Sequence, residues 1–437
     1  MPAAHAAGVA RAGVAAVAAE PKLARTRLAN GIRIVTERMP EARSVTTGFW
    51  VGVGARDEPL SVSGASHFLE HLLFKGTEAR TARQIAETVD QVGGEMNAFT
   101  AKEHTAYYTR LPDRDLAFGL DLLCDVLSAP AFRPHEIEAE RQVILEEILM
   151  SADEPADRVH TLLAEALFPD HPLGREVLGT EDSIAAMGRD DISGFFAEHY
   201  RPTNLVIAAA GNLDHDQVVA GVERRFPDTP AGVAPERRPP EREPVAVMVQ
   251  RRPTEQVNLA LGWRTFARGD DDRYALAVLN QVLGGGMSSR LFQQIREERG
   301  LAYSVYSFTS GYADTGALQV FAGTAPARAT QVLGLIDDEI DRLGTDGIAA
   351  GELDVARGYL EGSLLLGLED SGGRMARLGN DEIARGEITP VDEHVARIRA
   401  VTIDDVARVI KRVFTGPRSL AAVGPIDAED LVSSPAG

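Results

Sequence analysis

The feature that most constrains the fold of this chain is a set of three landmarks that occurs twice at the same spacing. Each set has a tryptophan in an alternating, strand-like run, a proline before an amphipathic helical pattern, and a glycine that ends a later strand-like run. The landmarks are Trp50, Pro112 and Gly211, and then Trp263, Pro326 and Gly424. The tryptophan precedes the proline by 62 or 63 residues and the glycine by 161 in both sets. This agreement predicts an internal duplication. The alternative is two unrelated α+β domains whose turns and element ends happen to have similar spacing.

A proline-rich segment divides the chain between the two sets. Its prolines stand among Arg and Glu, which is typical of a semi-rigid exposed linker; they are Pro227, Pro230, Pro235, Pro239, Pro240 and Pro244. The Ala-rich start of the chain has glycines that interrupt its apolar run, so we expect a disordered tail, with a transit-like peptide as the alternative. We therefore predict a tail at 1–24, an N-terminal half at 25–228, a linker at 229–244 and a homologous C-terminal half at 245–430.

Strand-like and helical patterns mix within each half without a regular alternation of the two. Apolar residues recur at helical spacing over 116–127 and 332–343, whereas 32–36 and 318–321 are typical of short strands. We therefore predict an α+β fold made of two homologous α/β-sandwich halves, each a sheet with helices packed on one face.

Composition excludes several classes of function. The chain has 437 residues, with 45 Lys and Arg against 65 Asp and Glu, which gives a net charge of −20. A broad nucleic-acid surface is disfavoured, because neutralising phosphates needs clustered Lys and Arg. No apolar run approaches the ~18–20 residues of a membrane span, and the single cysteine, Cys124, excludes an intrachain disulfide. We expect Cys124 to be a core residue, and the protein to be a bacterial cytoplasmic one that binds neither nucleic acid nor membrane.

One pentapeptide carries recognisable chemistry: His67-Phe68-Leu69-Glu70-His71. The surrounding apolar pattern predicts a helix, on which the two histidines, four residues apart, project from the same side. Two imidazole nitrogens at that spacing can bind one zinc ion. Glu70 would lie beside the metal, where it can accept a proton from a zinc-activated water molecule, as in the HxxEH pattern. The alternative is a pair of exposed histidines on an ordinary helix.

A further ligand is available about 75 residues later. The segment ERQVILEEI, at 140–148, predicts a helix on which Glu140 and Glu147 share a face, while Glu146 points about 100° away. Glu147 could bind zinc while Glu140 orients the site, or the two roles could be exchanged. Without the histidine pair, these glutamates would be taken for solvated charges.

Four segments, in order, resemble the pitrilysin-type zinc peptidases, the inverzincins, and most of all their mitochondrial-processing-peptidase branch. They are GASHFLEHLLFKGT, GGEMNAFTAKEHTAYY, ERQVILEEI and SSRLFQQIREERGLAYSVYS, and the similarity covers roughly residues 25–427. The resemblance implies two homologous halves arranged as a clamshell around a chamber, with one zinc ion per chain in the first half. By motif position it assigns the zinc ligands to His67, His71 and Glu147, the catalytic base to Glu70 and a supporting carboxylate to Glu140.

The resemblance also assigns residues that bind the substrate. Asn97, Ala98 and Phe99 match an edge strand that pairs with an extended peptide. Arg296 and Tyr303, seven residues apart, match a pair in the second half that reaches the substrate and the developing oxyanion, for which a tyrosine is a suitable donor.

Three other signals are less specific. The glycine-rich stretch at 283–289 lacks the Gly-Lys-Ser/Thr ending of a phosphate-binding loop, so a flexible turn is favoured, with substrate gating as the alternative. His104 lies in a family-like segment, and we expect a structural role. Asp157 matches one of two acidic positions that bind basic substrate residues, but the other is Thr161, so a solvated Asp157 is equally consistent with the sequence.

Together these assignments predict a zinc-dependent endopeptidase that cleaves extended peptides or precursor segments. The alternative is a non-catalytic partner or scaffold subunit, a class that the family contains. Such subunits lack part of HxxEH or keep only the Arg and Tyr pair, whereas this chain has both sets. We expect a homodimer, because the smaller family members usually pair, although one chain could also close by itself across the linker.

Overall fold

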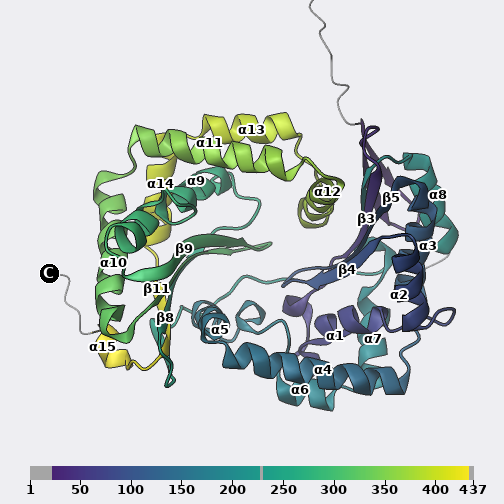
Figure 1. The fold of residues 1–437 in the computed structure, drawn as a ribbon, viewed down its shortest axis with the longest axis horizontal. Coiled ribbons are helices and arrows are strands. Elements are labelled where there is room, and N and C mark those ends of the chain that lie inside the picture. The colour runs from purple at the N-terminus through teal and green to yellow at the C-terminus, as the bar shows by residue number, and fades with distance from the viewer. Residues whose placement is uncertain (1–21, 227–229, 433–437) are drawn as a thin grey trace, which may run out of the picture.

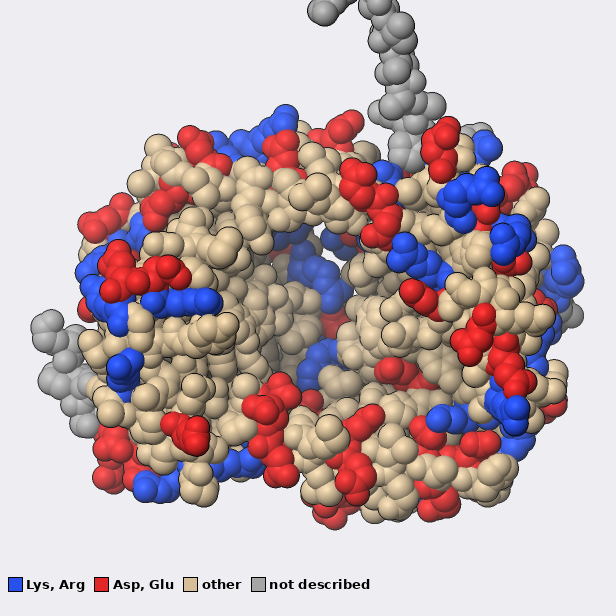
Figure 2. Space-filling model, viewed as in Figure 1, with Lys and Arg blue, Asp and Glu red and all other residues tan. Residues whose placement is uncertain are grey.

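The chain forms two halves that face each other across a hollow. The computed structural model describes residues 22–226 and 230–432. Figure 2 shows the hollow between the halves, with a visible wall that is mostly uncharged and with Lys and Arg near its centre. The first strand begins at Lys22, so 22–24 of the predicted tail belong to a sheet, and the rest of that tail lies outside the described residues.

The first half holds a six-stranded sheet. Its order is β1-β2-β6-β3-β5-β4, which leaves β4 at one edge. Neighbouring strands are antiparallel except for β2 and β6. The strands are β1 (Lys22–Arg27), β2 (Arg33–Arg38), β3 (Ser44–Val51), β4 (Glu95–Thr100), β5 (Thr105–Pro112) and β6 (Leu205–Gly211).

The second half repeats this sheet without a counterpart of β1. Its order is β7-β11-β8-β10-β9, with β9 at the edge and β7 parallel to β11. The strands are β7 (Val247–Arg251), β8 (Val257–Thr265), β9 (Ala302–Gly311), β10 (Gly316–Thr324) and β11 (Arg418–Gly424). Each strand has its equivalent in the same place of the first sheet, which confirms the two homologous halves.

The helices follow the same duplicated order. Those of the first half are α1 (Ala65–Leu73), α2 (Ala82–Gln91), α3 (Leu116–Ser128), α4 (Pro134–Asp153), α5 (Pro155–Leu167), α6 (Glu181–Ala186), α7 (Arg189–His199) and α8 (His215–Arg225). Those of the second half are α9 (Arg273–Leu283), α10 (Ala329–Asp346), α11 (Ala350–Gly367), α12 (Ser371–Arg385), α13 (Val391–Ala400), α14 (Ile403–Phe414) and α15 (Ala428–Val432). None of the helices in the described part of the chain has both the length and the apolarity to cross a membrane.

Equivalent helices of the two halves begin in the same way. The carboxylate of Asp191 accepts a hydrogen bond from the backbone N–H of Gly188 at 2.8 Å, at the start of α7. At the start of α14, Asp405 accepts one from Thr402 N–H, also at 2.8 Å. These side chains satisfy donors that the first helical turn leaves free. Each helix then leads to the strand that ends at Gly211 or Gly424.

Two equivalent helices, one from each half, each pack on the sheet of the other half; we call this the helix exchange. α5 of the first half packs on β8 and β11 of the second sheet, and α12 of the second half packs on β3 and β6 of the first (Figure 1). Leu163 of α5 belongs to one core cluster with Ala260 of β8, and Met375 and Leu378 of α12 belong to another with Trp50. Each sheet therefore has helices of its own half on one face, as predicted, and a helix of the other half on the opposite face.

The segment between the halves contacts the first half. Residues 230–244 contain no helix or strand, as expected of a linker. However, Thr203 Oγ1 donates to the carbonyl of Gly232 at 2.8 Å, and Arg237 forms an ion pair with Asp57 at 2.8 Å. The side chain of Arg237 is only 20% exposed, so this part of the linker is held in place rather than free.

Candidate metal centre

The helix that carries the two histidines is fixed at its start. Gly64 precedes α1 with φ of +91°, a conformation that favours glycine. The buried carboxylate of Glu58 accepts hydrogen bonds from the backbone N–H groups of Gly64 and Ser66, each at 2.7 Å. Phe68 and Leu69 are fully buried in the core of the first half. Glu58 was not predicted from the sequence, because its contact with α1 spans a turn without a helical pattern.

Three predicted ligands come together between α1 and α4. Nε2 of His67 lies 3.6 Å from Oε2 of Glu147, and Nε2 of His71 lies 3.7 Å from the same oxygen. One ligand atom from each residue lies within 4.8 Å of the other two. Two ligands that each stand ~2.1 Å from a tetrahedral ion are about 3.4 Å apart, so this donor set fits zinc.

Glu140 lies on the other side of the His71 ring. Nδ1 of His71 is 3.0 Å from Oε2 of Glu140, and Lys75 Nζ is 2.7 Å from the other oxygen. With Nδ1–H donated to this carboxylate, the lone pair of Nε2 is directed at the ligand cluster. The geometry therefore favours the first of the two alternatives, in which Glu147 joins the cluster and Glu140 orients a histidine.

His67 stays neutral in this environment. Burial, and to a lesser degree the charge of His71, lowers the pKa of His67 to about 4. Its Nδ1 is buried and has no hydrogen-bond partner within the described residues. A neutral imidazole is the form that binds a metal ion.

Glu70 extends from the same helix next to the cluster. Its Oε2 accepts a hydrogen bond from Oγ1 of Thr100, the last residue of β4, at 2.5 Å. Burial raises the pKa of Glu70, and this effect outweighs the hydrogen bond from Thr100 and the charge of His71, which lower it. A carboxylate with a raised pKa is a better proton acceptor, as a general base requires.

The predicted substrate strand is β4. It pairs with β5 on one side and, within the described residues, with no strand on the other. Its side chains alternate between half-buried and exposed, and Phe99 contacts the ring of His104 at a centroid distance of 5.7 Å. Asn97 and Ala98 therefore lie on an edge whose backbone groups can pair with an added strand.

Arg296 and Tyr303 contact each other in the second half. Cζ of Arg296, in a π-helical turn at Phe292–Glu297, lies 4.7 Å from the centroid of the Tyr303 ring. Tyr303 is the extra residue of a β-bulge, since Ala302 pairs with Thr324 and Ser304 with Gly323. The bulge leaves Tyr303 77% exposed. Neither residue is hydrogen-bonded or ion-paired to the histidine cluster in the parts of the chain that the structure describes.

Thr161, which stands where the family has a second acidic residue, contacts a carboxylate from a loop. Asp157 lies in the first turn of α5, and Thr161 follows one turn later. The hydroxyl of Thr161 donates to the carboxylate of Glu176. An acidic group thus stands beside Thr161, but it lies 15 residues later in the chain, outside the position that the motif indicates.

The remaining candidates of the sequence analysis lie outside the metal cluster. His104 contacts Phe99, and burial lowers its pKa to about 4. Cys124 is fully buried in the core of the first half, as expected. The glycine-rich stretch follows α9 as a series of turns.

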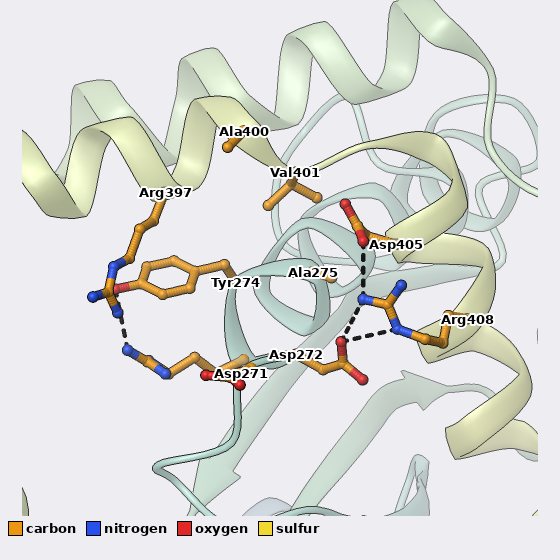
Figure 3. A pocket seen from close by; sticks show the side chains of 10 residues that line it. Asp271, Asp272, Tyr274, Ala275, Arg397, Ala400, Val401, Asp405 and Arg408 are labelled. Carbon is orange, nitrogen blue, oxygen red and sulfur yellow. Dashed lines mark hydrogen bonds and ion pairs between the residues drawn. The ribbon is translucent and has the colours of Figure 1, made fainter.

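A separate cavity of about 350 Å³ lies between α9, α13 and α14 (Figure 3). Arg408 forms ion pairs there with Asp272 at 2.6 Å and Asp405 at 2.9 Å. On the other side, the guanidinium groups of Arg273 and Arg397 lie beside Tyr274. The cavity contains none of the predicted site residues, and Asp272 is also paired with Arg412 at 3.0 Å.

Family comparisons match two successive parts of the chain. Residues 33–181 match the family described as insulinase, peptidase family M16, and residues 186–360 match the family described as peptidase M16 inactive domain. The first match contains the histidine cluster with Glu70, and the second contains Arg296 and Tyr303.

Relatives found by sequence include two bacterial proteins. An uncharacterised zinc protease of Streptomyces coelicolor is 48% identical over 415 residues, which is 92% of this chain and 89% of the relative. An uncharacterised zinc protease of Bacillus subtilis is 40% identical over 397 residues, which is 91% of this chain and 97% of the relative.

Solved structures share the fold. A protease from Helicobacter pylori has a TM-score of 0.87 at 22% identity, and the match covers 93% of this chain and 100% of the other. A structure from Pseudomonas fluorescens, described as a peptidase M16 inactive domain, has a TM-score of 0.86 at 21% identity, with coverage of 93% and 98%.

Proposed function

The chain belongs to peptidase family M16, and on this premise we propose that it is a zinc-dependent endopeptidase that cleaves extended peptides or precursor segments. One observation carries the proposal. His67, His71 and Glu147 form a donor set that suits zinc, and Glu70 stands beside them with a raised pKa. A structural zinc site would instead be closed by a fourth protein ligand.

The proposed ligands would hold one zinc ion per chain. They are Nε2 of His67, Nε2 of His71 and the carboxylate of Glu147, with Glu140 keeping the His71 ring in place. When bound, zinc polarises the scissile carbonyl and makes a water molecule more acidic. Glu70 would accept the proton of that water and pass it to the leaving amine. Thr100 would keep the Glu70 carboxylate facing the ligand cluster.

The substrate would bind as a strand added to β4. Asn97, Ala98 and Phe99 offer the free edge for this pairing. From the other half, Tyr303 would donate to the developing oxyanion and Arg296, stacked on its ring, would support it. Asp157 is the residue that we propose for binding a basic substrate side chain.

The alternative function is a non-catalytic partner or scaffold subunit. The match that is described as inactive spans residues 186–360 and does not include HxxEH, so it does not favour this alternative for the whole chain. Among the described residues, both the zinc donor set and the Arg296–Tyr303 pair are present.

The proposal is tested with the purified chain and a mixed library of internally quenched peptides. We expect turnover, about one zinc per chain, loss of activity on chelation and recovery when zinc is added back. One zinc per chain without turnover of any peptide would favour the scaffold function. Protein that was purified without chelator and contains no zinc would contradict the metal assignment.

We also infer that two copies form a homodimer and that the protein works in the bacterial cytoplasm. The first inference rests on the family resemblance, and the second on the bacterial relatives. Sedimentation velocity tests the dimer: a mass of one chain, 46.9 kDa, at all concentrations would contradict it. Cell fractionation tests the location.

A further inference from the structure

The proposed site is divided between the halves, so its geometry depends on how the halves are held together. The histidine cluster lies in the first half, and Tyr303 lies on β9 of the second. The two edge strands meet through their turns: the β4–β5 turn at 101–104 contacts the β9–β10 turn at 312–315. In Figure 1, β4 and β9 point toward each other across the middle of the molecule.

Glu103 is the residue that joins these turns. Its side chain is only 3% exposed. Its carboxylate accepts a hydrogen bond from Nη2 of Arg268 at 2.6 Å and from the backbone N–H of Ala313 at 3.0 Å, both in the second half. Arg268 also donates to the carbonyl of Gly311, the last residue of β9, at 2.8 Å. One carboxylate of the first half thus holds the end of β9.

Arg56 and the linker complete the junction. Arg56 donates to Glu103 at 2.7 Å and to Asp314 of the second half at 2.6 Å, and its side chain is 2% exposed. From the linker, Arg237 donates to the carbonyl of Glu103 at 2.6 Å and pairs with Asp57 at 2.8 Å. The junction therefore includes both hairpin turns and the segment between the halves.

The buried carboxylate of Glu103 has all of its cationic partners only when the two halves are held in this arrangement. Burial raises the pKa of Glu103, but the hydrogen bond from Ala313 and the charges of Arg237 and Arg268 lower it overall. The carboxylate is therefore ionised at neutral pH. A buried carboxylate without its cations is strongly disfavoured, and one of these cations, Arg268, comes from the second half.

The junction lies close in sequence to the proposed chemistry. Thr100, three residues before Glu103, holds the carboxylate of Glu70 at 2.5 Å. Asn97, Ala98 and Phe99 directly precede Thr100. A shift of the turn would therefore move both the proposed substrate strand and the hydroxyl that holds the proposed base.

We propose that Glu103 is a positioning residue, whose carboxylate locks the β4–β5 hairpin to the β9–β10 hairpin and so fixes the substrate strand relative to Tyr303. This inference rests on the proposed peptidase function. Glu103 itself is bonded to neither Glu70 nor the zinc ligands, and it acts through β4 and β9.

The first test is Glu103→Gln, which keeps the size of the side chain and removes its charge. We expect zinc content to stay at the wild-type level, kcat on a quenched peptide to fall about 10- to 100-fold and KM to change much less, because misplacement affects the transition state most. The matched control is Glu352→Gln, which breaks an arginine pair with Arg290 inside the second half and should leave kcat unchanged. A Glu103→Gln variant within twofold of wild-type kcat would overturn the proposal.

A second variant separates positioning from a general loss of stability. Arg268→Gln removes the partner in the other half while leaving Glu103 intact. If the two residues act as one junction, the double variant is no slower than the slower single variant. Losses that multiply would contradict the proposal. If Glu103→Gln fails to fold, Arg268→Gln tests the proposal by itself. The same fall in kcat at unchanged zinc content would support it, and an unchanged kcat would overturn it.

Hydrogen exchange gives a measurement that needs no peptidase activity. In Glu103→Gln, the amides of 95–112 and 302–324 should exchange faster than in wild type, whereas other strands should not. Unchanged exchange in both hairpins would overturn the inference. A wild type that cleaves no peptide would overturn the proposed function alone, and exchange would then still decide whether Glu103 joins the hairpins.

Discussion

The two ring nitrogens of His71 have different partners, and this difference organises the candidate site. Nδ1 lies against Glu140 at 3.0 Å, which leaves Nε2 for the side that Glu147 occupies. Glu140 is in turn paired with Lys75 at 2.7 Å, so its negative charge is balanced behind the ring. On the Nε2 side of the ring, the negative charge comes from Glu147 and Glu70, and this is the side on which a dication would be bound.

The first prediction concerns Glu70→Gln. The amide keeps the contact with Thr100 but cannot accept a proton, so we expect zinc content near one per chain and a fall in kcat of at least 100-fold. Quenched-peptide kinetics with metal analysis of the same samples checks this. The control is Glu146→Gln, at an exposed residue of α4 that points about 100° away from Glu147 and should keep full activity. A Glu70→Gln variant with substantial turnover would remove Glu70 from the role of base.

The second prediction concerns His104, which packs beside the charges of Glu103, Arg237 and Arg268. Burial lowers its pKa from 6.5 to about 4. Between pH 6.5 and about pH 4, His104 binds a proton in the unfolded chain but not in the folded chain, so the free energy of unfolding falls as the pH drops. Between pH 7.5 and pH 5 the contribution of His104 should fall by about 2 kcal/mol.

Urea unfolding of wild type and His104→Gln at both pH values checks this, with the zinc removed from all samples. The variant should lose less stability than wild type as the pH is lowered. Equal losses would show that other histidines account for the whole effect.

At the scale of elements, apolar periodicity predicted several helices and strands, because a half-buried element must repeat with its own geometry. The segments at 116–127 and 332–343 are helical, and the strands that end at Gly211 and Gly424 are present. The bulge at Tyr303 was not predictable, because pairing between β9 and β10 creates it. The exchange of α5 and α12 was not predictable either, because an apolar helix face does not specify which sheet it covers.

The third prediction concerns the contact of α12 with the first sheet. At Gly379, an added Cβ would lie 2.4 Å from three atoms of the Trp50 ring, so the helix approaches the ring directly. Because Trp50 is fully buried, Gly379→Ala should destabilise the protein by about 1–3 kcal/mol. Gly358→Ala, in α11 with no neighbouring atom within 4 Å of the new Cβ, should instead stabilise it by about 0.5–1 kcal/mol. Urea unfolding measures both; the same sign for both would contradict the close approach.

At the scale of the molecule, the duplication was visible in the sequence, but the dependence of the halves on each other was not. Equal spacing of Trp50 and Trp263 from later landmarks indicates two copies of one unit, each with its own sheet. It carries no information on contacts between the copies, such as Glu103 with Arg268. Those contacts join residues far apart in the sequence, and no pattern in a single sequence links them.

The fourth prediction follows from the helix exchange: neither half should fold properly alone. A separate first half would expose the face of its sheet that includes Trp50, and a separate second half would lose α5. The apolar residues of α5 and its end that are buried against the second sheet are Val159, Leu162, Leu163, Leu167 and Phe168. At about 2 kcal/mol each, their burial contributes about 10 kcal/mol, which is comparable to the stability of a whole domain.

Expression of 1–228 and 229–437, separately and together, checks this. Each half alone should aggregate or bind a hydrophobic dye, whereas the co-expressed halves should purify as a one-to-one complex that unfolds in one transition, as the intact chain does. The intact chain and the complex should also bind the same amount of zinc, because all the proposed zinc ligands lie in the first half. A single half that unfolds cooperatively and binds no dye would contradict the prediction. Each half would then be an independent domain whose folding does not need the helix of the other half. In that case Glu103 and the linker would have to fix the two halves of the site without help from a shared core.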